Sequence, residues 1–148
     1  MSHTRQQAYI DAPVQVVWDL ISDVDRHPEW WPRVLEVECD GLEPSCTYRE
    51  VVKTPFGEDE MILRVDELRD CEQFTIRCVN TGTFVKMALT PAQEGTFLDA
   101  RMGMEPGKLG DRVWDAVAGK RYFRNWLQIS LAAMREVAEQ RAAGRPSA

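Results

Sequence analysis

The sequence has little positive charge and few histidines. Its 148 residues carry 18 Lys and Arg against 24 Asp and Glu, which gives a net charge of −6, and it contains two histidines. Proteins that bind nucleic acid or an anionic membrane surface need a concentrated basic face, and these scattered cations do not supply one. We therefore expect neither nucleic acid nor a membrane surface as a partner.

Cysteine is also scarce, and its spacing does not fit a metal site. Cys39 and Cys46 form one pair, and Cys71 and Cys78 form another. The gap within each pair is longer than the roughly two to four residues typical of zinc-binding loops, and the histidines lie far away in the sequence. We predict four reduced thiols, no bound metal and no cofactor.

Long apolar runs and catalytic motifs are missing as well. No stretch approaches the roughly 20 apolar residues of a membrane-spanning helix. The first residues, MSHTRQQAY, lack the apolar core of a signal peptide, so the expected location is the cytoplasm. The motifs of serine hydrolases, zinc proteases, P-loop enzymes and dinucleotide-binding enzymes are absent, so no motif identifies a reaction.

What the sequence does contain is one long amphipathic segment near its C-terminus, from about Gly110 to Gln140. No proline interrupts it, and its apolar residues recur at helical spacing. The predicted apolar stripe consists of Leu109, Val113, Ala116, Phe123, Leu127, Leu131, Met134 and Ala138. Such a helix must bury one face. Because no other helix of this length is predicted, its partner must be a sheet.

Lys120 falls within this stripe and allows two interpretations. A long cationic side chain can cross apolar surface and reach water near a helix end. Alternatively, the first half of the stripe lines a cavity, in which Lys120 meets a polar group of a ligand.

Most of the remaining chain alternates between apolar and polar residues, the period of a half-buried strand. A first strand at 5–11 precedes two short helical segments, 13–22 and 23–31, and six alternating stretches follow. Closely spaced strands favour an antiparallel meander. We predict one α+β domain at residues 1–141, followed by a frayed tail at 142–148. In this domain a seven-stranded curved antiparallel sheet wraps around the long helix.

Several inward positions carry methionine or alanine, and this leaves two interpretations of the interior. Methionine can fill irregular space in a solid core, or it can line an apolar cavity that admits a guest molecule. The predicted lining of such a cavity consists of inward-facing residues: Trp30, Leu63, Val65, Phe74, Ile76, Met87, Leu89, Ala100, Met102, Ala116, Lys120, Phe123 and Leu127.

The catalytic candidates depend on which face of one strand points inward. If Val52 faces in, so do Tyr48 and Glu50; the pKa of Glu50 would then be raised, and Tyr48 could donate to a carbonyl group. With the opposite parity Val51 faces in and Glu50 is solvated, in keeping with how rarely glutamate is buried. Tyr48, Glu50 and Lys120 are the catalytic candidates.

Other polar and aromatic residues are assigned to the surface or to packing. His27 precedes Pro28 in a predicted exposed turn, so we expect a surface role for it rather than catalysis. Trp114, Tyr122 and Trp126 lie on the flank of the long helix. They either form a contact with another protein or pack against the short helices and strand ends.

The order of elements and several short motifs resemble a known superfamily. The motifs are Ile10-Asp-Ala-Pro13, Val17-Trp18-Asp-Leu20-Ile21, Pro28-Glu-Trp30-Trp31-Pro32, and Leu89-Thr-Pro91 followed by Gly95-Thr96. They resemble the START/SRPBCC superfamily and, within it, the bacterial polyketide cyclase/dehydrase family. The resemblance implies the helix-grip fold and an internal cavity for a hydrophobic or aromatic small molecule, lipid- or polyketide-like.

Three functions remain open under this resemblance. The protein binds or carries the molecule, acts on it as a polyketide aromatase/cyclase or dehydratase, or serves as a protein-interaction module without a ligand. The matching motifs mainly pack the short helices against the sheet, so they are not specific for a reaction. Both a monomer and a homodimer are compatible with the sequence.

Overall fold

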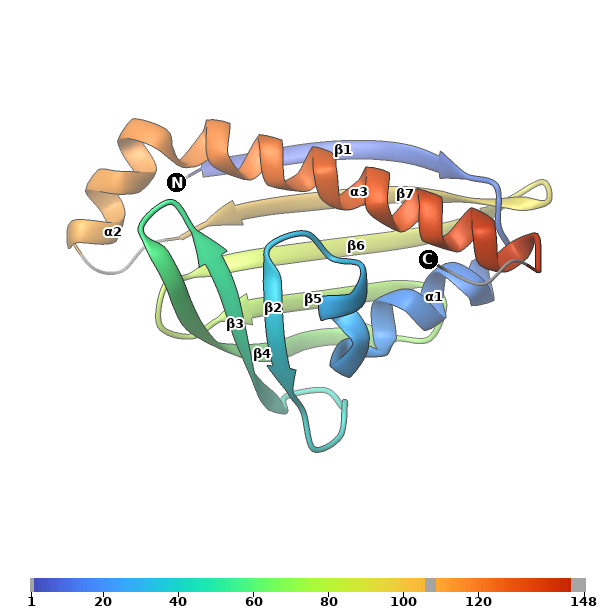
Figure 1. The fold of residues 1–148 in the computed structure, drawn as a ribbon, viewed down its shortest axis with the longest axis horizontal. Helices are drawn as coiled ribbons and strands as arrows, with labels where there is room; N and C mark the ends of the chain where they lie inside the picture. Colours follow the sequence, from blue (N-terminus) through green and yellow to red (C-terminus); the bar gives the residue numbers. More distant parts are fainter. Residues whose placement is uncertain (1, 106–108, 145–148) are drawn as a thin grey trace.

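The computed structural model describes residues 2–105 and 109–144 (Figure 1). The N-terminal elements are β1 (Ser2–Ile10), the helix α1 (Val14–Ser22) and the 3-10 helix η1 (Val24–Glu29). Six strands follow: β2 (Val34–Glu38), β3 (Thr47–Thr54), β4 (Gly57–Arg69), β5 (Gln73–Cys78), β6 (Thr83–Ala92) and β7 (Gly95–Met104). The C-terminal helical segments are α2 (Leu109–Trp114), the π-helical turn η2 (Asp115–Gly119) and α3 (Lys120–Ala142).

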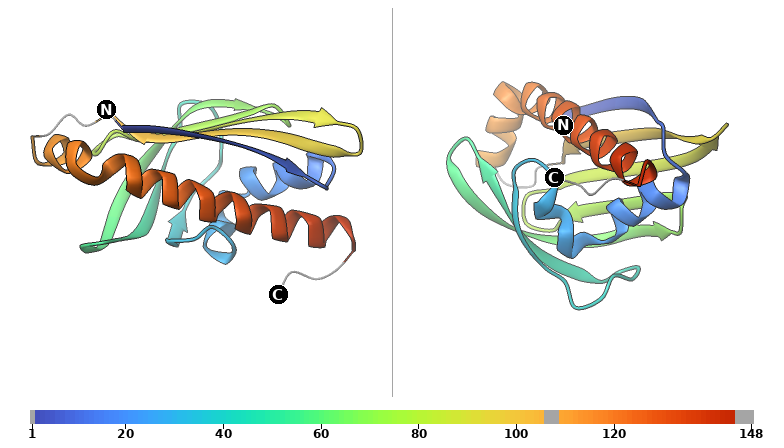
Figure 2. Two further views of the ribbon diagram at one scale, coloured as in Figure 1. Left: turned by 90° about the horizontal axis from the view of Figure 1, so that it is seen from above. Right: turned by 45° about the vertical axis from the view of Figure 1, so that its right-hand side comes forward.

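The seven strands form one antiparallel sheet in the order β1-β7-β6-β5-β4-β3-β2. The six predicted strands of the meander are therefore adjacent in space, and β1 is the edge strand beside β7. Figure 2 shows α1 and α3 on the same side of the curved sheet, with α3 packed mainly on β1 and β7. The predicted α+β architecture is confirmed.

The core lies between the sheet and α3, and the predicted inward residues of the central strands fill it. Because side chains alternate along a strand, each strand contributes every second residue to this core. The buried set includes Met61, Leu63, Val65, Phe74, Ile76, Cys78, Val85, Met87, Leu89, Leu98, Ala100, Met102 and Met104 from the sheet, and Phe123, Leu127, Leu131, Met134 and Ala138 from α3.

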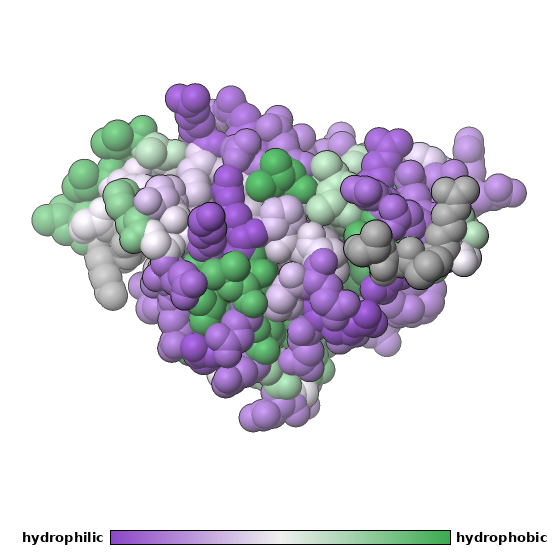
Figure 3. Space-filling model, in the orientation of Figure 1, coloured by the Kyte–Doolittle hydropathy of each residue, from purple (hydrophilic) through white to green (hydrophobic). Residues whose placement is uncertain are grey.

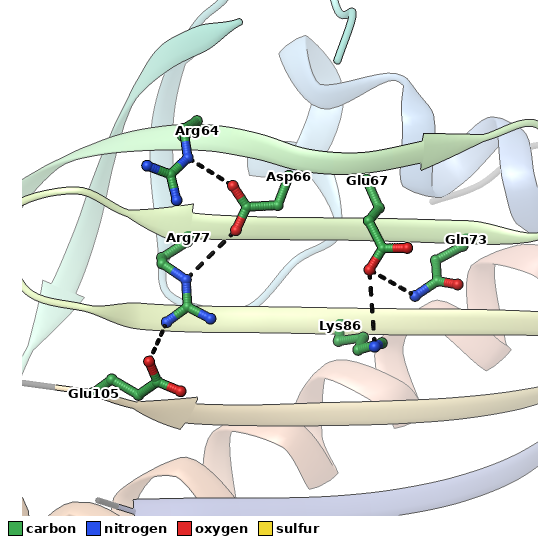
Figure 4. A network of polar contacts seen from close by, with 7 residues as sticks. All are labelled: Arg64, Asp66, Glu67, Gln73, Arg77, Lys86 and Glu105. Carbon is green, nitrogen blue, oxygen red and sulfur yellow. Dashed lines mark hydrogen bonds and ion pairs between the residues drawn. The ribbon is translucent and has the colours of Figure 1, made fainter. Parts of the chain in front are cut away.

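The outer face of the sheet carries ion pairs both within and between strands (Figure 4). Asp66 lies between Arg64, at 2.6 Å, and Arg77, at 3.4 Å, and Arg77 also reaches Glu105 at 3.0 Å. A second group centres on Glu67. Exposed pairs of this kind contribute about 0–1 kcal/mol each. The buried inner face, rather than these pairs, therefore supplies most of the stability of the sheet.

The C-terminal helix differs from its prediction in its first third. Leu109 and Val113, which the helical stripe places inside, are 77% and 57% exposed. The physical reason is the π-helical turn at Asp115–Gly119: its hydrogen bonds span one more residue than those of an α-helix, so the residues before it are rotated out of register. The later stripe, from Phe123 onward, is buried as predicted.

Gly82, between β5 and β6, occupies a position that only glycine fits. Its φ is +78°, and an added Cβ would clash with the backbone carbonyl oxygen of Glu105. We expect Gly82→Ala to lower the free energy of unfolding by at least about 2 kcal/mol, measured by denaturant titration. Gly110→Ala is the matched control, since its Cβ would meet open space. Equal unfolding midpoints for the two variants would contradict this account of the turn.

Candidate ligand pocket

A pocket of about 560 Å³ opens between the β3–β4 hairpin and the helical segments α2 and α3. Figure 1 shows the hairpin and α2 at the same end of the molecule. The lining consists of Val52, Thr54, Pro55, Phe56, Glu58, Asp59, Met61, Thr81, Thr83, Met104, Gly110, Trp114, Tyr122, Phe123 and Trp126. A pocket of this size falls in the range that takes small organic molecules.

Aromatic side chains build the helical wall of the pocket. The ring of Trp114 lies 5.3 Å from that of Tyr122 and 5.9 Å from that of Phe123, both edge to face. The ring centroids of Tyr122 and Trp126 are 5.8 Å apart. The indole N–H of Trp126 donates a hydrogen bond of 2.8 Å to the carbonyl oxygen of Pro32. These contacts hold the wall in place, and its flat apolar surfaces suit a planar apolar guest.

Exposed apolar side chains lie on the hairpin and on the helical segments that bound this pocket. Phe56 at the tip of the hairpin is 84% exposed, and Val117 on the helical turn η2 is 82% exposed. Figure 3 shows apolar surface over α2, where Leu109 and Val113 are also exposed. An apolar guest would therefore meet apolar surface before it enters the pocket.

A smaller cavity of about 20 Å³, here called the inner chamber, adjoins the pocket. Three residues, Met61, Thr83 and Trp126, line both spaces. The remaining lining of the chamber consists of Trp31, Val34, Glu50, Leu63, Ile76 and Val85. A space of this size holds about one water-sized group.

Glu50 lies on the inner face of β3. Its register partner on β4 is Met61, and Tyr48, Glu50 and Val52 are all at least 95% buried. The inward parity is thus correct, and the solvated alternative is wrong. Burial raises the pKa of Glu50 to about 8, because water is removed from a carboxyl group that gains no ion pair in the described part of the chain. At neutral pH Glu50 is therefore protonated and can donate a hydrogen bond.

Tyr48 is buried on the same strand but lines neither the pocket nor the chamber. Its hydroxyl oxygen has no hydrogen-bond partner among the described residues. Burial, and then the nearby Glu50, raise the pKa of Tyr48 well above its usual value. Tyr48 stays a neutral neighbour of the site under ordinary conditions.

Lys120 is exposed and lines neither space, so the interpretation that places it in a cavity is wrong. The neighbouring Gly119 and Phe123 are buried. The buried face of the helix therefore passes beside Lys120 at this point, and the ammonium group reaches water.

The predicted cavity residues divide into three groups. Phe123 lines the pocket, and Leu63 and Ile76 line the chamber. The side chain of Ala116 lies outside the described residues. The others are buried core residues that line neither space: Trp30, Val65, Phe74, Met87, Leu89, Ala100, Met102 and Leu127. These eight residues are packed in the core, whereas the pocket and the chamber lie toward the end of the molecule near the hairpin.

Sequence reasoning missed several pocket residues. Phe56 and Pro55 belong to a segment whose sequence indicates only a turn, and the predicted lining contains Trp30 but not its neighbour Trp31. The available signals were the inward methionines Met61 and Met104, because flexible side chains collect where packing is irregular.

His27 is completely buried, so its predicted surface role is wrong. Its Nε2 lies 2.8 Å from the carbonyl oxygen of Ile21, and its ring contacts Trp30, Trp31 and Phe74. Burial lowers the pKa of His27 to about 4, so the ring is neutral near pH 7. His27 fixes η1 against α1 and supports the two tryptophans.

The thiols and the other metal-ligating side chains are the remaining candidates for a functional site. The four cysteines are free thiols. Within residues 2–105 and 109–144, no group of His, Cys, Asp and Glu is arranged to hold a metal ion. No helix in the same ranges has the length and apolarity needed to cross a membrane.

Comparisons with known proteins agree with this architecture. A family model described as polyketide cyclase / dehydrase and lipid transport matches residues 1–139, whereas no curated protein matches significantly. A START superfamily protein from Mycobacterium smegmatis has a TM-score of 0.75 at 16% identity, over 95% of this chain and 99% of that one.

Two similar structures are described as aromatase/cyclases or ARO/CYC proteins. The Zhui aromatase/cyclase from a Streptomyces species has a TM-score of 0.73 at 20% identity, over 97% of this chain and 98% of that one. The di-domain ARO/CYC StfQ of the steffimycin biosynthetic pathway gives 0.73 at 20%, over 95% of this chain and 51% of that one. At these identities the likeness establishes the fold, and the predicted helix-grip fold is confirmed.

Proposed function

Because the chain belongs to the polyketide cyclase / dehydrase and lipid transport family, we propose that it binds a hydrophobic or aromatic small molecule, lipid- or polyketide-like. The site is the pocket between the β3–β4 hairpin and the helical segments α2 and α3. The observation that carries the proposal is a space of about 560 Å³ with an aromatic wall and an apolar mouth.

Two measurements in sequence test this proposal. Native mass spectrometry of protein purified from its own host, followed by solvent extraction, would identify a bound hydrophobic molecule. Calorimetric titration with 2-acetylnaphthalene, a planar apolar probe, would then measure affinity. Failure to find any adduct, together with no binding of lipids, quinones or aromatic ketones, would contradict a ligand function.

Tyr122→Ala is expected to weaken binding of the naphthalene probe about tenfold. Tyr122 is half-buried and forms the middle of the aromatic wall, so its loss removes both contact area and the support of Trp114. Tyr9→Ala is the control, since Tyr9 is 41% exposed on β1 and lies outside the pocket. Equal affinities for the two variants would place the probe elsewhere on the molecule.

Catalysis is the second candidate function, and Glu50 is the observation that favours it. A buried carboxyl group whose pKa is about 8 can exchange protons near neutral pH, as a general acid or base requires. In a dehydration of a β-hydroxyketone, it would donate its proton to the departing hydroxyl group, and in the ionised form it would remove the α-proton. A Glu50→Gln variant that keeps ligand affinity but loses turnover would support an aromatase/cyclase or dehydratase.

A further inference from the structure

The inner chamber brings together two buried polar groups without partners. Glu50 is 5% exposed, and no described residue forms an ion pair or hydrogen bond with its carboxyl group. Trp31 is 4% exposed and borders the same cavity, and its indole N–H has no acceptor within residues 2–105 and 109–144. A buried donor without an acceptor costs about 1–3 kcal/mol. An acceptor atom that enters the chamber would remove that cost.

The chamber restricts what this acceptor can be. Its volume of about 20 Å³ admits one oxygen-sized group but not a carboxylate or a phosphate. The rest of the lining is mostly apolar, and the hydroxyl of Thr83 is already within 2.9 Å of that of Thr81. An entering anion would meet no cation in this lining, and burial of an unpaired charge is strongly unfavourable. The occupant is therefore a neutral acceptor.

We propose that the inner chamber is a binding site for a single ketone or quinone carbonyl oxygen of the ligand, with the protonated carboxyl group of Glu50 and the indole N–H of Trp31 as its two donors. The proposal rests on the proposed function, because the carbonyl group must belong to a molecule held in the adjoining pocket. It adds that the ligand carries such an oxygen at its buried end.

A carbonyl fits this pair of donors better than a hydroxyl or a hydrocarbon does. A carbonyl oxygen has two lone pairs and no hydrogen, so it can accept from both donors at once. A hydroxyl group would have to place its hydrogen on the carbonyl oxygen of the same carboxyl group whose O–H it accepts, at less favourable angles, and a hydrocarbon would leave both donors unpaired. Sites of this kind discriminate strongly against a ligand that lacks the matching polar atom.

The donor role of Glu50 makes recognition depend on pH. Tyr48, on the same strand, is a nearby titratable group; Glu50 contributes to its raised pKa, whereas burial is the cause of the raised pKa of Glu50. The neighbouring elements present uncharged side chains to the chamber, namely Met61, Leu63, Ile76, Thr83, Val85 and Trp126. Since burial raises the pKa of Glu50 to about 8, the carboxyl group donates below that pH and becomes an acceptor above it. Preference for a carbonyl is expected to disappear in alkaline solution.

The test compares two probes of nearly the same shape, 2-acetylnaphthalene and 2-isopropenylnaphthalene. In the second probe a C=CH₂ group replaces the C=O group of the first. At about pH 6.5 the wild type should bind the ketone about tenfold more tightly, and at about pH 9.5 the two affinities should converge. Glu50→Gln, whose amide also donates, should keep the preference at both pH values. Glu50→Leu should lower the preference to about threefold at both pH values, because the indole N–H of Trp31 remains.

Each outcome separates this proposal from the proposed function. If the wild type binds both probes equally at pH 6.5, the pocket stands and the carbonyl site is wrong. An undiminished tenfold ketone preference in Glu50→Leu also overturns it. If neither probe binds, the proposed function fails together with this inference. Trp31→Phe keeps an aromatic side chain but removes the indole N–H, so it provides an independent variant and should reduce the preference about threefold.

Discussion

Replacing Glu50 by glutamine is expected to stabilise the protein by about 4 kcal/mol at pH 9, and by far less at pH 4. The pKa of Glu50 is about 8 in the folded protein, because burial disfavours the charged form, and the usual value of 4.5 applies when the chain unfolds. Below pH 4.5 both states are neutral. Between pH 4.5 and 8 only the unfolded state releases its proton, so the wild type loses stability as the pH rises.

Denaturant titrations at several pH values between about 4 and 9.5 would measure this effect. The isosteric amide carries no charge, so the difference between the variant and the wild type should grow across the window and level off above pH 8. Glu60→Gln is the control: Glu60 is exposed on β4 and pairs with Arg49, so the change should be within about 1 kcal/mol. A difference for Glu50→Gln that is constant with pH would show that Glu50 is solvated.

A buried acid that lowers the free energy of unfolding at neutral pH indicates a functional site. Most natural sequences agree with local rules of burial, and violations concentrate at functional sites. Here the violation coincides with the inner chamber and adjoins the pocket. The proposals for the carbonyl site and for proton transfer both use this single residue, which is why its variants separate them.

The overall fold could be predicted because its pattern is redundant. Each central strand repeats the same alternation several times, so an error at one residue does not change the assignment of the strand. The buried stripe of α3 from Phe123 to Ala138 is also clear, since no π-helical turn falls within it. The motifs near the N-terminus that carry the family resemblance fix the order of the elements.

The site could not be predicted as well, because it depends on contacts between elements. In β3, the consecutive residues Glu50, Val51 and Val52 are all buried, so alternation alone cannot choose the inward face. The pairing of Glu50 with Met61 on β4 determines which face points inward, and this pairing depends on tertiary structure rather than on the sequence of β3. Likewise, no residue type marks the π-helical turn at Asp115–Gly119, although it moves Trp114 against Tyr122.

His27 illustrates the same limit. The sequence around it is polar and contains proline, which is typical of an exposed turn. In the folded chain, however, η1 folds back so that the ring lies under Trp30 and Trp31 and its Nε2 reaches the carbonyl of Ile21. This packing also determines the second large effect of pH.

Acidification from pH 6.5 to pH 4 is expected to lower the free energy of unfolding by about 3 kcal/mol because of His27. The pKa of His27 is lowered to about 4 in the folded protein by burial, compared with 6.5 when unfolded. In this window the unfolded state binds the proton and the folded state does not, so stability falls as the pH falls. Below pH 4 both states are protonated, and His27 contributes no further slope.

The effects of His27 and Glu50 oppose one another between about pH 4.5 and 6.5, so the wild type alone would show a flattened profile. The Glu50→Gln background removes one of them. Adding His27→Gln, whose amide can still donate to Ile21, should then abolish about 3 kcal/mol of pH dependence, whatever its effect on absolute stability. His3→Gln, at an exposed position on β1, is the control. If the slope persists in the double variant, His27 is not the group that titrates.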